Sequence, residues 1–251
     1  MTAHLAHILR HPIKSVGYEE IESAPLTRGR ALPFDRRWAI AHQAAKPEGP
    51  MTAWAGKQNF LRGAAAPSLM AIRAATAADG RITLTHPEAG SLAVHPDLSE
   101  DQAALIAWLR PLWPAHRPAP RSVEHAPGMA LTDSPEPYVS VLSQSSLDAL
   151  GAATGVPLSR NRFRGNLWVE GWLPWSERAL AGRNLRIGTA VLEIVEPITR
   201  CRATCANPET GHEDLDVLSL LQQLNGDAQF GLFAVVREAG TITRGDHVEI
   251  S

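Results

Sequence analysis

Short runs of apolar residues, many of them β-branched, recur along most of the chain. Such runs, when Gly, Pro, Asn or Asp residues bound them, are typical of β-strands. The run from Val191 to Ile198, just before the two cysteines, is rich in β-branched and aliphatic residues and predicts a strand. The same pattern predicts strands at residues 5–10, 20–26, 39–41, 69–75, 81–85, 91–94, 138–142, 167–169, 230–237 and 247–250.

Helical patterns are fewer than strand patterns. Ser99-Glu100-Asp101-Gln102 has the form of a capping box, so Ser99 is the predicted N-cap of a first helix. Ser143 is the predicted N-cap of a second helix over residues 144–154. Apolar leucines on neighbouring faces predict a third helix over residues 214–224.

Residues 116–127 contain three prolines and little hydrophobic periodicity, which predicts a boundary between two domains, 1–118 and 119–251. Many short strands with few helices predict a mainly β fold with some helices (α+β). Two β-barrel-like domains fit this pattern better than a doubly wound sheet. The chain shows no internal repeat, phosphate-binding glycine loop or nucleophile-elbow motif.

Composition excludes several classes of function. The chain has 251 residues and a net charge of −2, so no overall positive charge indicates a nucleic-acid partner. No apolar run approaches the roughly 18 residues of a membrane span, and no signal peptide opens the chain. With only two cysteines and no export signal, we expect a cytoplasmic, reduced protein.

Both cysteines lie in residues 196–211, where the predicted strand gives way to a loop. Arg200 and Arg202 flank Cys201. A cysteine acts as a nucleophile or a metal ligand in its thiolate form, and neighbouring positive charge favours that form. Burial as a small apolar residue is the alternative for Cys201. A disulfide to Cys205 is disfavoured in a chain with two cysteines, and a zinc site with His212 lacks a fourth ligand.

Basic residues gather in three further loops. Lys14 and Ser15 lie between Pro12 and Gly17, and Arg36 precedes the predicted strand at residues 39–41. Residues 160–166 hold three arginines and two asparagines between predicted elements. This last segment indicates a binding site for an anion, and a solvated basic loop is the alternative.

Five short motifs occur in order along the chain. They are Pro12-Ile13-Lys14-Ser15, Asp35-Arg36-Arg37-Trp38, Phe163-Arg164-Gly165-Asn166, Arg200-Cys201 with Pro208-Glu209-Thr210-Gly211, and Gly240-Thr241-Ile242 with Gly245-Asp246. Together they resemble the MOSC family, named after the C-terminal domain of molybdenum-cofactor sulfurase. The resemblance covers nearly the whole chain, including the β-barrel domain that usually precedes the MOSC domain. It is strongest to the mitochondrial amidoxime-reducing component and its bacterial relatives.

The resemblance implies a molybdenum cofactor, that is molybdopterin with its metal, bound between the two domains. It implies that Cys201 ligates the metal, a role that suits a soft thiolate. Residues matching or adjoining the family's cofactor-binding positions are Lys14, Ser15, Arg36, Ser134, Arg162, Arg164, Asn166 and Arg200. Arg162 does not correspond to any position of the quoted motifs. In the turn before residue 138, either Thr132 or Ser134 would contribute to cofactor binding. Asp133 is the proposed proton donor, and Cys205 a packing residue rather than a second metal ligand.

The resemblance therefore implies an oxidoreductase that reduces N-hydroxylated small molecules, such as amidoximes, hydroxylamines or N-hydroxylated bases. Electrons would come from a separate protein carrying flavin, haem or an iron–sulfur centre. One alternative is a sulfur or cofactor carrier with a persulfide on Cys201. Another is a binding module for a pterin or anion without catalysis. Pyridoxal phosphate binding belongs to the family as a whole, and this chain lacks the long domain that uses it in the sulfurases.

Overall fold

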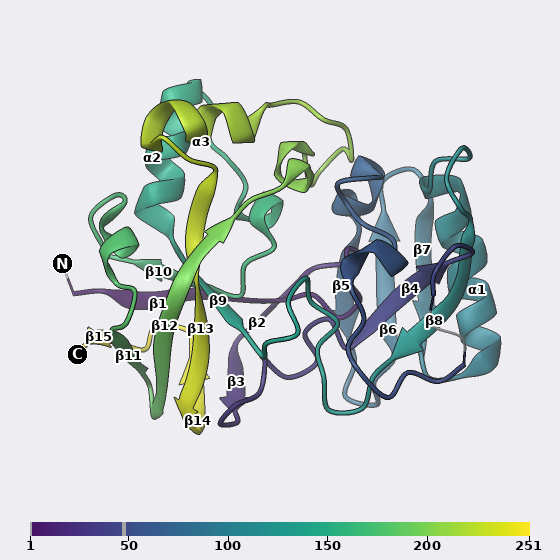
Figure 1. The fold of residues 1–251 in the computed structure, drawn as a ribbon, viewed down its shortest axis with the longest axis horizontal. Coiled ribbons are helices and arrows are strands. Elements are labelled where there is room, and N and C mark those ends of the chain that lie inside the picture. The colour runs from purple at the N-terminus through teal and green to yellow at the C-terminus, as the bar shows by residue number, and fades with distance from the viewer. Residues whose placement is uncertain (1, 47–48) are drawn as a thin grey trace.

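The computed structural model describes residues 2–46 and 49–251. It is built mainly of strands with three α-helices in this part of the chain, which confirms the α+β prediction. Figure 1 shows two lobes side by side. The smaller lobe, with strands β4–β8 and helix α1, is on the right, and the larger lobe, with the main sheet, is on the left.

The larger lobe is organised on one eight-stranded sheet, in which all neighbours are antiparallel except the parallel pair β9 and β10. The strand order is β15 (Val248–Ile250), β11 (Asn184–Ile187), β12 (Ala190–Thr199), β13 (Gln229–Glu238), β9 (Val139–Ser143), β10 (Leu167–Glu170), β1 (His4–Arg10) and β2 (Glu19–Ile21). A separate pair, β3 (Ser23–Leu26) and β14 (Gly240–Thr243), packs against it.

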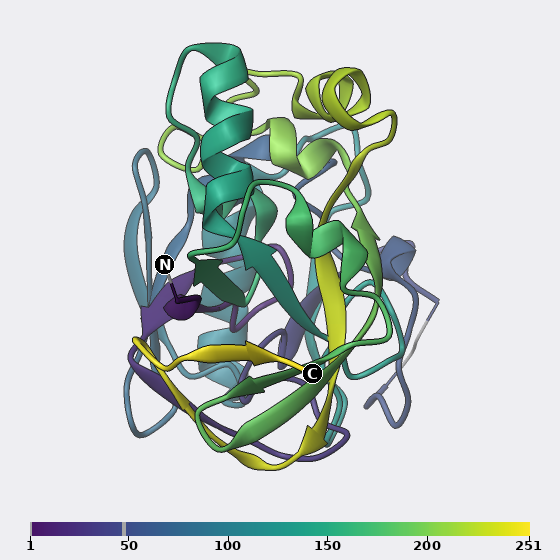
Figure 2. The same ribbon diagram turned by 90° about the vertical axis from the view of Figure 1, so that its left-hand side faces the viewer.

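This sheet curls so that its β15 end meets β1, the strand next to its other end. The backbone N–H of Leu5 in β1 donates to Asp246 O at 2.8 Å, and Gly245 N–H donates to Leu5 O at 2.7 Å. Val248 N–H, at the start of β15, donates to Ala3 O at 2.9 Å. A barrel-like interior results, filled by the alternate apolar side chains of the strands, among them Leu5, Val141 and Leu192. Figure 2 views this curled sheet from the side.

The smaller lobe contains two small sheets around a second apolar core. One pairs β5 (Arg73–Thr76), β6 (Ile82–His86) and β7 (Gly90–Val94), and the other pairs β4 (Trp38–His42) with β8 (Pro120–His125). Helix α1 (Ser99–Leu109) packs on β7 and β8. In the larger lobe, α2 (Gln144–Thr154) and α3 (Val217–Asn225) contribute to a third core with the aromatic rings of Phe163 and Trp168.

The lobes are interleaved in sequence. Strands β1, β2 and β3 precede the smaller lobe along the chain, yet they pair with strands of the larger lobe. Strand β8 lies in the proline-rich segment where the domain boundary is predicted. The boundary after residue 118 stays a prediction, and the pairing of β8 with β4 extends the smaller lobe to His125.

Two other local predictions are corrected. Leu98 rather than Ser99 is the N-cap of α1, because the Asp101 carboxylate accepts from His95 N–H and Gln102 donates to Pro96 O. Residues 69–75 are not one strand, since a 3₁₀ turn over Pro67–Ala71 precedes β5.

Candidate functional site

The loop after β1 and the turn before β4 are joined by backbone hydrogen bonds. Arg36 N–H donates to His11 O at 2.7 Å, Trp38 N–H donates to Pro12 O at 3.2 Å, and Lys14 N–H donates to Trp38 O at 2.7 Å. These bonds place the side chains of Lys14 and Arg36 next to each other at the junction of the lobes. The two basic loops predicted from the sequence are therefore one structural unit.

Three predicted cofactor-binding residues have a left-handed backbone, with φ of 60° at Ser15 and 47° at both Arg36 and Arg164. They account for three of the five non-glycine residues with positive φ in the described ranges. This conformation is uncommon for side chains larger than Asn and is strained. Strain gathered at one set of predicted binding positions is typical of a functional site.

The guanidinium groups of three separate loops meet here. Arg36 Nη2 donates to Arg164 O at 2.6 Å, and Arg164 Nη2 lies 3.4 Å from Ile13 O. Arg200 follows β12, and its guanidinium donates to Phe163 O at 2.8 Å and Phe230 O at 2.7 Å. We call Lys14, Arg36, Arg164 and Arg200 the basic cluster.

Two carboxylates face the basic cluster. Asp35 is buried and forms an ion pair with Arg36. Lys14 Nζ donates to Asp133 Oδ1 at 2.5 Å, and Lys57 lies 3.5 Å from the other oxygen of that carboxylate. Four cations against two carboxylates leave the junction with excess positive charge.

The pKa values of the cluster are lowered mainly by burial, and neighbouring cations add to the effect. Burial, assisted by the Arg36 guanidinium, lowers the pKa of Arg164 to about 9. Burial likewise lowers the pKa of Arg200 to about 9, with Arg36 acting in the same direction. Burial lowers the pKa of Lys14 although Asp133 opposes the change. A buried cation held so far below its usual pKa lacks sufficient counter-charge.

Unpartnered donors point to the same conclusion. Arg164 Nη1 and Arg200 Nη2 are buried nitrogens with no hydrogen-bond partner in the described chain. Buried polar groups are normally satisfied, so two unpartnered guanidinium nitrogens in one cluster are unusual and would suit an anionic ligand. The donor set suits the phosphate of a pterin cofactor, which wants guanidinium and ammonium partners.

Cys201 lies directly after Arg200, at the start of the 3₁₀ turn Arg202–Cys205, and its side chain is exposed. Its carbonyl accepts from Thr204 N–H at 3.1 Å and from Thr204 Oγ1 at 3.0 Å, which fixes the turn. The predicted metal ligand is thus open to solvent at the edge of the basic cluster. No group of three or more His, Cys, Asp or Glu side chains in the described part is placed to hold a metal by itself.

Three other predicted site residues use their side chains in hydrogen bonds within the fold. Arg162 is 5% exposed and donates to Asp214 Oδ2 at 2.7 Å and toward Cys205 O at 3.4 Å. The Asn166 amide is used within the fold, accepting from Ser140 N–H and Oγ and donating to Leu9 O. Ser134 Oγ accepts from Glu136 N–H in its own turn. In this structure these three residues shape the loops around the basic cluster.

Cys205 is buried in the third core, as predicted for a packing residue. The proton-donor role of Asp133 stays a prediction. Burial favours its neutral form, but the Lys14 and Lys57 ammonium groups outweigh burial and lower its pKa. Asp133 is therefore a carboxylate in the resting protein.

Sequence reasoning missed the buried pair formed by His11 and Asp35. Asp35 belongs to a quoted motif and His11 directly precedes another, yet nothing in the residue pattern shows that the two loops pack together. His11 Nδ1 lies 3.2 Å from Asp35 Oδ1, and the backbone N–H of His11 donates to the same oxygen at 2.8 Å. The contact between His11 and Asp35 joins residues far apart in sequence, so only the folded structure reveals it.

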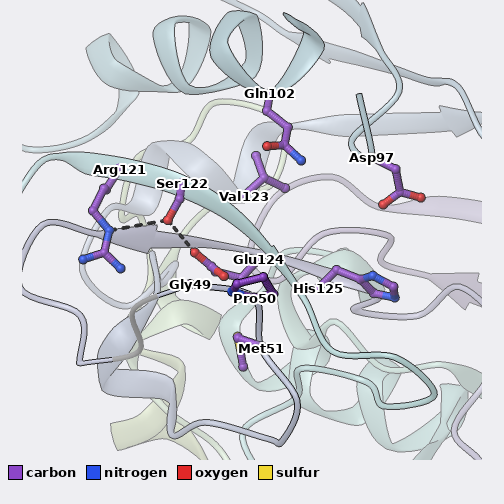
Figure 3. Close-up of a pocket in the computed structure, with 10 residues that line it drawn as sticks. All are labelled: Gly49, Pro50, Met51, Asp97, Gln102, Arg121, Ser122, Val123, Glu124 and His125. Atoms are coloured by element: carbon purple, nitrogen blue, oxygen red, sulfur yellow. Dashed lines mark hydrogen bonds between the residues drawn. The ribbon is translucent and has the colours of Figure 1, made fainter. Parts of the chain in front are cut away.

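Two pockets lie away from the basic cluster. The larger, of about 650 Å³, lies between β8 and residues 49–51 in the smaller lobe, and Figure 3 shows side chains such as Glu124 and His125 along it. A smaller cavity of about 220 Å³ lies at the lobe junction and includes Tyr18 and Asn161. No cluster residue lines either pocket. Across the described residues, no helix is long and apolar enough to cross a membrane.

Comparison with known proteins agrees with the two lobes. Residues 2–110 match the MOSC N-terminal beta barrel domain, and residues 129–249 match the MOSC domain. The chain therefore belongs to the MOSC family, in the arrangement in which that N-terminal domain precedes the MOSC domain.

Individual relatives are more distant. The molybdenum cofactor sulfurase of Drosophila grimshawi is 28% identical over 94 residues, which cover 37% of this chain and 12% of the sulfurase. The chain thus matches only about an eighth of that curated relative. The crystal structure of the YUAD protein from Bacillus subtilis aligns with 100% of this chain and 96% of its own, with a TM-score of 0.47 and 12% identity. YiiM from Geobacillus stearothermophilus aligns over 45% of this chain and 53% of its own, with a TM-score of 0.37 and 17% identity.

Proposed function

We propose that this protein is a molybdenum-cofactor-dependent reductase of N-hydroxylated small molecules. The observation that carries the proposal is the exposed thiol of Cys201 beside a basic cluster with two buried, unpartnered guanidinium nitrogens. A cofactor with a soft metal at one end and a phosphate at the other would use both features. Membership of the MOSC family supports the same cofactor.

In this proposal each group of the chain has a defined task. Cys201 would ligate the metal as a thiolate, and it directly follows Arg200 of the basic cluster. Lys14, Arg36 and Arg164 would hold the phosphate, and Ser15 lies in the same strained loop. When bound, the cofactor would supply the two-electron chemistry that converts N–OH to N–H with release of water.

The reaction also consumes two protons, and the cluster offers a route for them. Lys14 and Asp133 share a short hydrogen bond, and the Asp133 side chain is 54% exposed. Asp133 would collect protons from solvent and pass them inward, and burial of Lys14 with its lowered pKa eases such exchange. A separate redox protein, located with this one in the cytoplasm, would deliver the electrons.

The test is molybdenum content and amidoxime reduction, measured on protein from a cofactor-producing host with an artificial electron donor. We expect about one metal per chain, and loss of both metal and activity in Cys201→Ala. Cys205→Ala is the matched control, since that cysteine is buried in a core, and it should retain most of the metal. Full activity in Cys201→Ala would refute the assignment.

A sulfur carrier is the second candidate, favoured by the exposure of Cys201 and the likeness to a molybdenum cofactor sulfurase. The Cys201 thiolate would attack the outer sulfur of a donor persulfide, and the donor thiolate would leave. Mass spectrometry distinguishes the candidates. One added sulfur on Cys201 in protein without pterin or molybdenum would favour the carrier over the reductase.

A further inference from the structure

His11 is the most deeply buried titratable group at the lobe junction, and the proposed reductase chemistry gives it no task. Its side chain has no exposed surface. The carboxylate oxygen Oδ1 of Asp35 can only accept a hydrogen bond, so the neutral ring carries its proton on Nδ1 and donates it to Asp35. The other ring nitrogen, Nε2, is then unprotonated and can only accept. Nε2 has no hydrogen-bond partner in the described residues.

The ring is enclosed by opposing charges from two loops. Asp35 and Arg36 face it from the turn before β4, and Arg164 faces it from the loop after the 3₁₀ turn Arg160–Phe163. Asp35 also pairs with Arg36, and Arg36 holds the carbonyl of Arg164. A neutral imidazole therefore lies behind two guanidinium groups, one of which has an unpartnered nitrogen.

We propose that His11 takes up one proton when a doubly charged oxyanion, such as a phosphate monoester, binds at Arg36 and Arg164. The inference rests on the proposed anion site and adds a fifth cation to it. The proton comes from solvent and bonds to Nε2, while the Nδ1–H bond to Asp35 is kept. No electrons are transferred.

The charges explain why the two events are coupled. In the free protein, burial and the Arg36 and Arg164 charges hold the pKa of His11 well below 6.5, although Asp35 opposes them. A bound dianion neutralises the two guanidinium groups and leaves the attraction of Asp35 in place. The charged form of the imidazole then becomes stable, and its attraction strengthens binding of the dianion.

Sulfate is the probe, because it stays a dianion near neutral pH and cannot supply the proton itself. Sulfate is titrated into cofactor-free protein by calorimetry, in two buffers with different heats of ionisation. We expect uptake approaching one proton per sulfate bound. The affinity should rise as the pH falls, by up to about tenfold per pH unit.

His11→Asn keeps a donor near Asp35 but removes the titrating nitrogen, so sulfate should bind without proton uptake. His4→Asn, which changes an exposed histidine at the start of β1, is the matched control and should keep the uptake. Nitrogen NMR of labelled histidine in the unmodified protein gives the same answer without a variant. The His11 ring signals should change to the doubly protonated form when sulfate is added.

Sulfate binding with no proton uptake and unchanged His11 signals would overturn the inference and leave the proposed function intact. Failure of sulfate to bind, or equal binding by Arg164→Met, would overturn the anion site itself. The proposed function would then lose its support together with the inference.

Discussion

Arg164 combines three unfavourable features in one residue. Its backbone is left-handed, its guanidinium is buried, and one of its nitrogens has no partner. Burying a charge without full compensation destabilises a fold, so the arrangement lowers stability in the cofactor-free protein. Residues of this kind are typical of sites that are completed by a ligand.

Arg164→Met should therefore stabilise the cofactor-free protein, raising its free energy of unfolding by about 1–3 kcal/mol. The same variant should lose sulfate binding, because a bidentate donor is removed. Denaturant unfolding and calorimetry measure the two effects. Arg186→Met changes an exposed arginine in β11 and should alter neither quantity. A destabilised Arg164→Met variant with normal sulfate affinity would contradict this account.

The buried His11 predicts how stability depends on pH. Its pKa is lower in the folded chain than the usual 6.5, so the unfolded chain binds a proton first as the pH falls. Stability should then decrease from about pH 6.5 downward, until the pH reaches the folded-state pKa. The slope from this one group is at most about 1.4 kcal/mol per pH unit.

His11→Asn should flatten this part of the stability curve, as measured by chemical denaturation at a series of pH values. His4→Asn should leave the curve unchanged. A curve of the same slope in His11→Asn would show that other groups cause the acid sensitivity.

Single residues were only partly predictable from the sequence. Lys14, Arg36 and Arg164 were expected at one anion, and the structure places them within one cluster. Arg162 was expected there too, but it lies within the 3₁₀ turn that ends before Arg164, and its partner is Asp214. Such a distinction depends on local geometry that residue types do not carry.

At the scale of elements, Arg162 and Asp214 join the two loops of the site. Asp214 accepts from Arg162 and from Asn207 Nδ2 at 2.8 Å, and its backbone N–H donates to Cys205 O. The hydrogen bond from Arg162 lowers the pKa of Asp214, with Asn207 adding to the effect. This network fixes the Cys201 loop relative to the segment that bears Arg164.

Asp214→Asn should weaken this connection, because it leaves the buried Arg162 without its counter-charge. We expect a loss of about 1–3 kcal/mol in the free energy of unfolding and faster proteolysis within residues 202–213. Arg202→Gln removes an exposed ion pair with Glu213 in the same loop and serves as the control. Equal proteolysis of both variants would argue against a specific role for Asp214.

Elements with a local chemical cause were predicted well. Ser143 accepts from Ser146 N–H at the start of α2, and Gly155 ends that helix in the left-handed region. Strand β8 was missed because Pro120 begins it and Pro118 and Pro127 flank it, and proline lowers strand propensity. It forms nonetheless, since β4 offers it a partner far away in sequence.

At the scale of the molecule, the larger lobe is not assembled from one continuous stretch of chain. Strand β1 lies between β10 and residues 245–248, and β3 pairs with β14. The larger lobe therefore contains three strands that precede the smaller lobe: β1 and β2 in its eight-stranded sheet, and β3 in the separate pair with β14. We expect the two lobes to unfold in a single transition.

A fragment of residues 129–251 should not fold by itself. Strand β10 and residues 245–248 would both lose their pairing with β1, and the apolar core would be exposed. Adding residues 2–26 through a linker after residue 251 should restore the native circular dichroism and NMR spectra. A well-dispersed NMR spectrum from the shorter fragment alone would disprove this dependence.

The closure of the sheet by β1 also sets an order of events during protein synthesis. β1 leaves the ribosome long before the residues around Asp246 that complete its pairing. Until then the nascent chain carries an unpaired strand edge and the apolar side chains of Leu5 and Ile8, which belong to the core of the finished fold. Pairing over so long a stretch of chain is slow. The larger lobe can therefore close only after the residues around Asp246 have left the ribosome, and β1 must be shielded from aggregation until then.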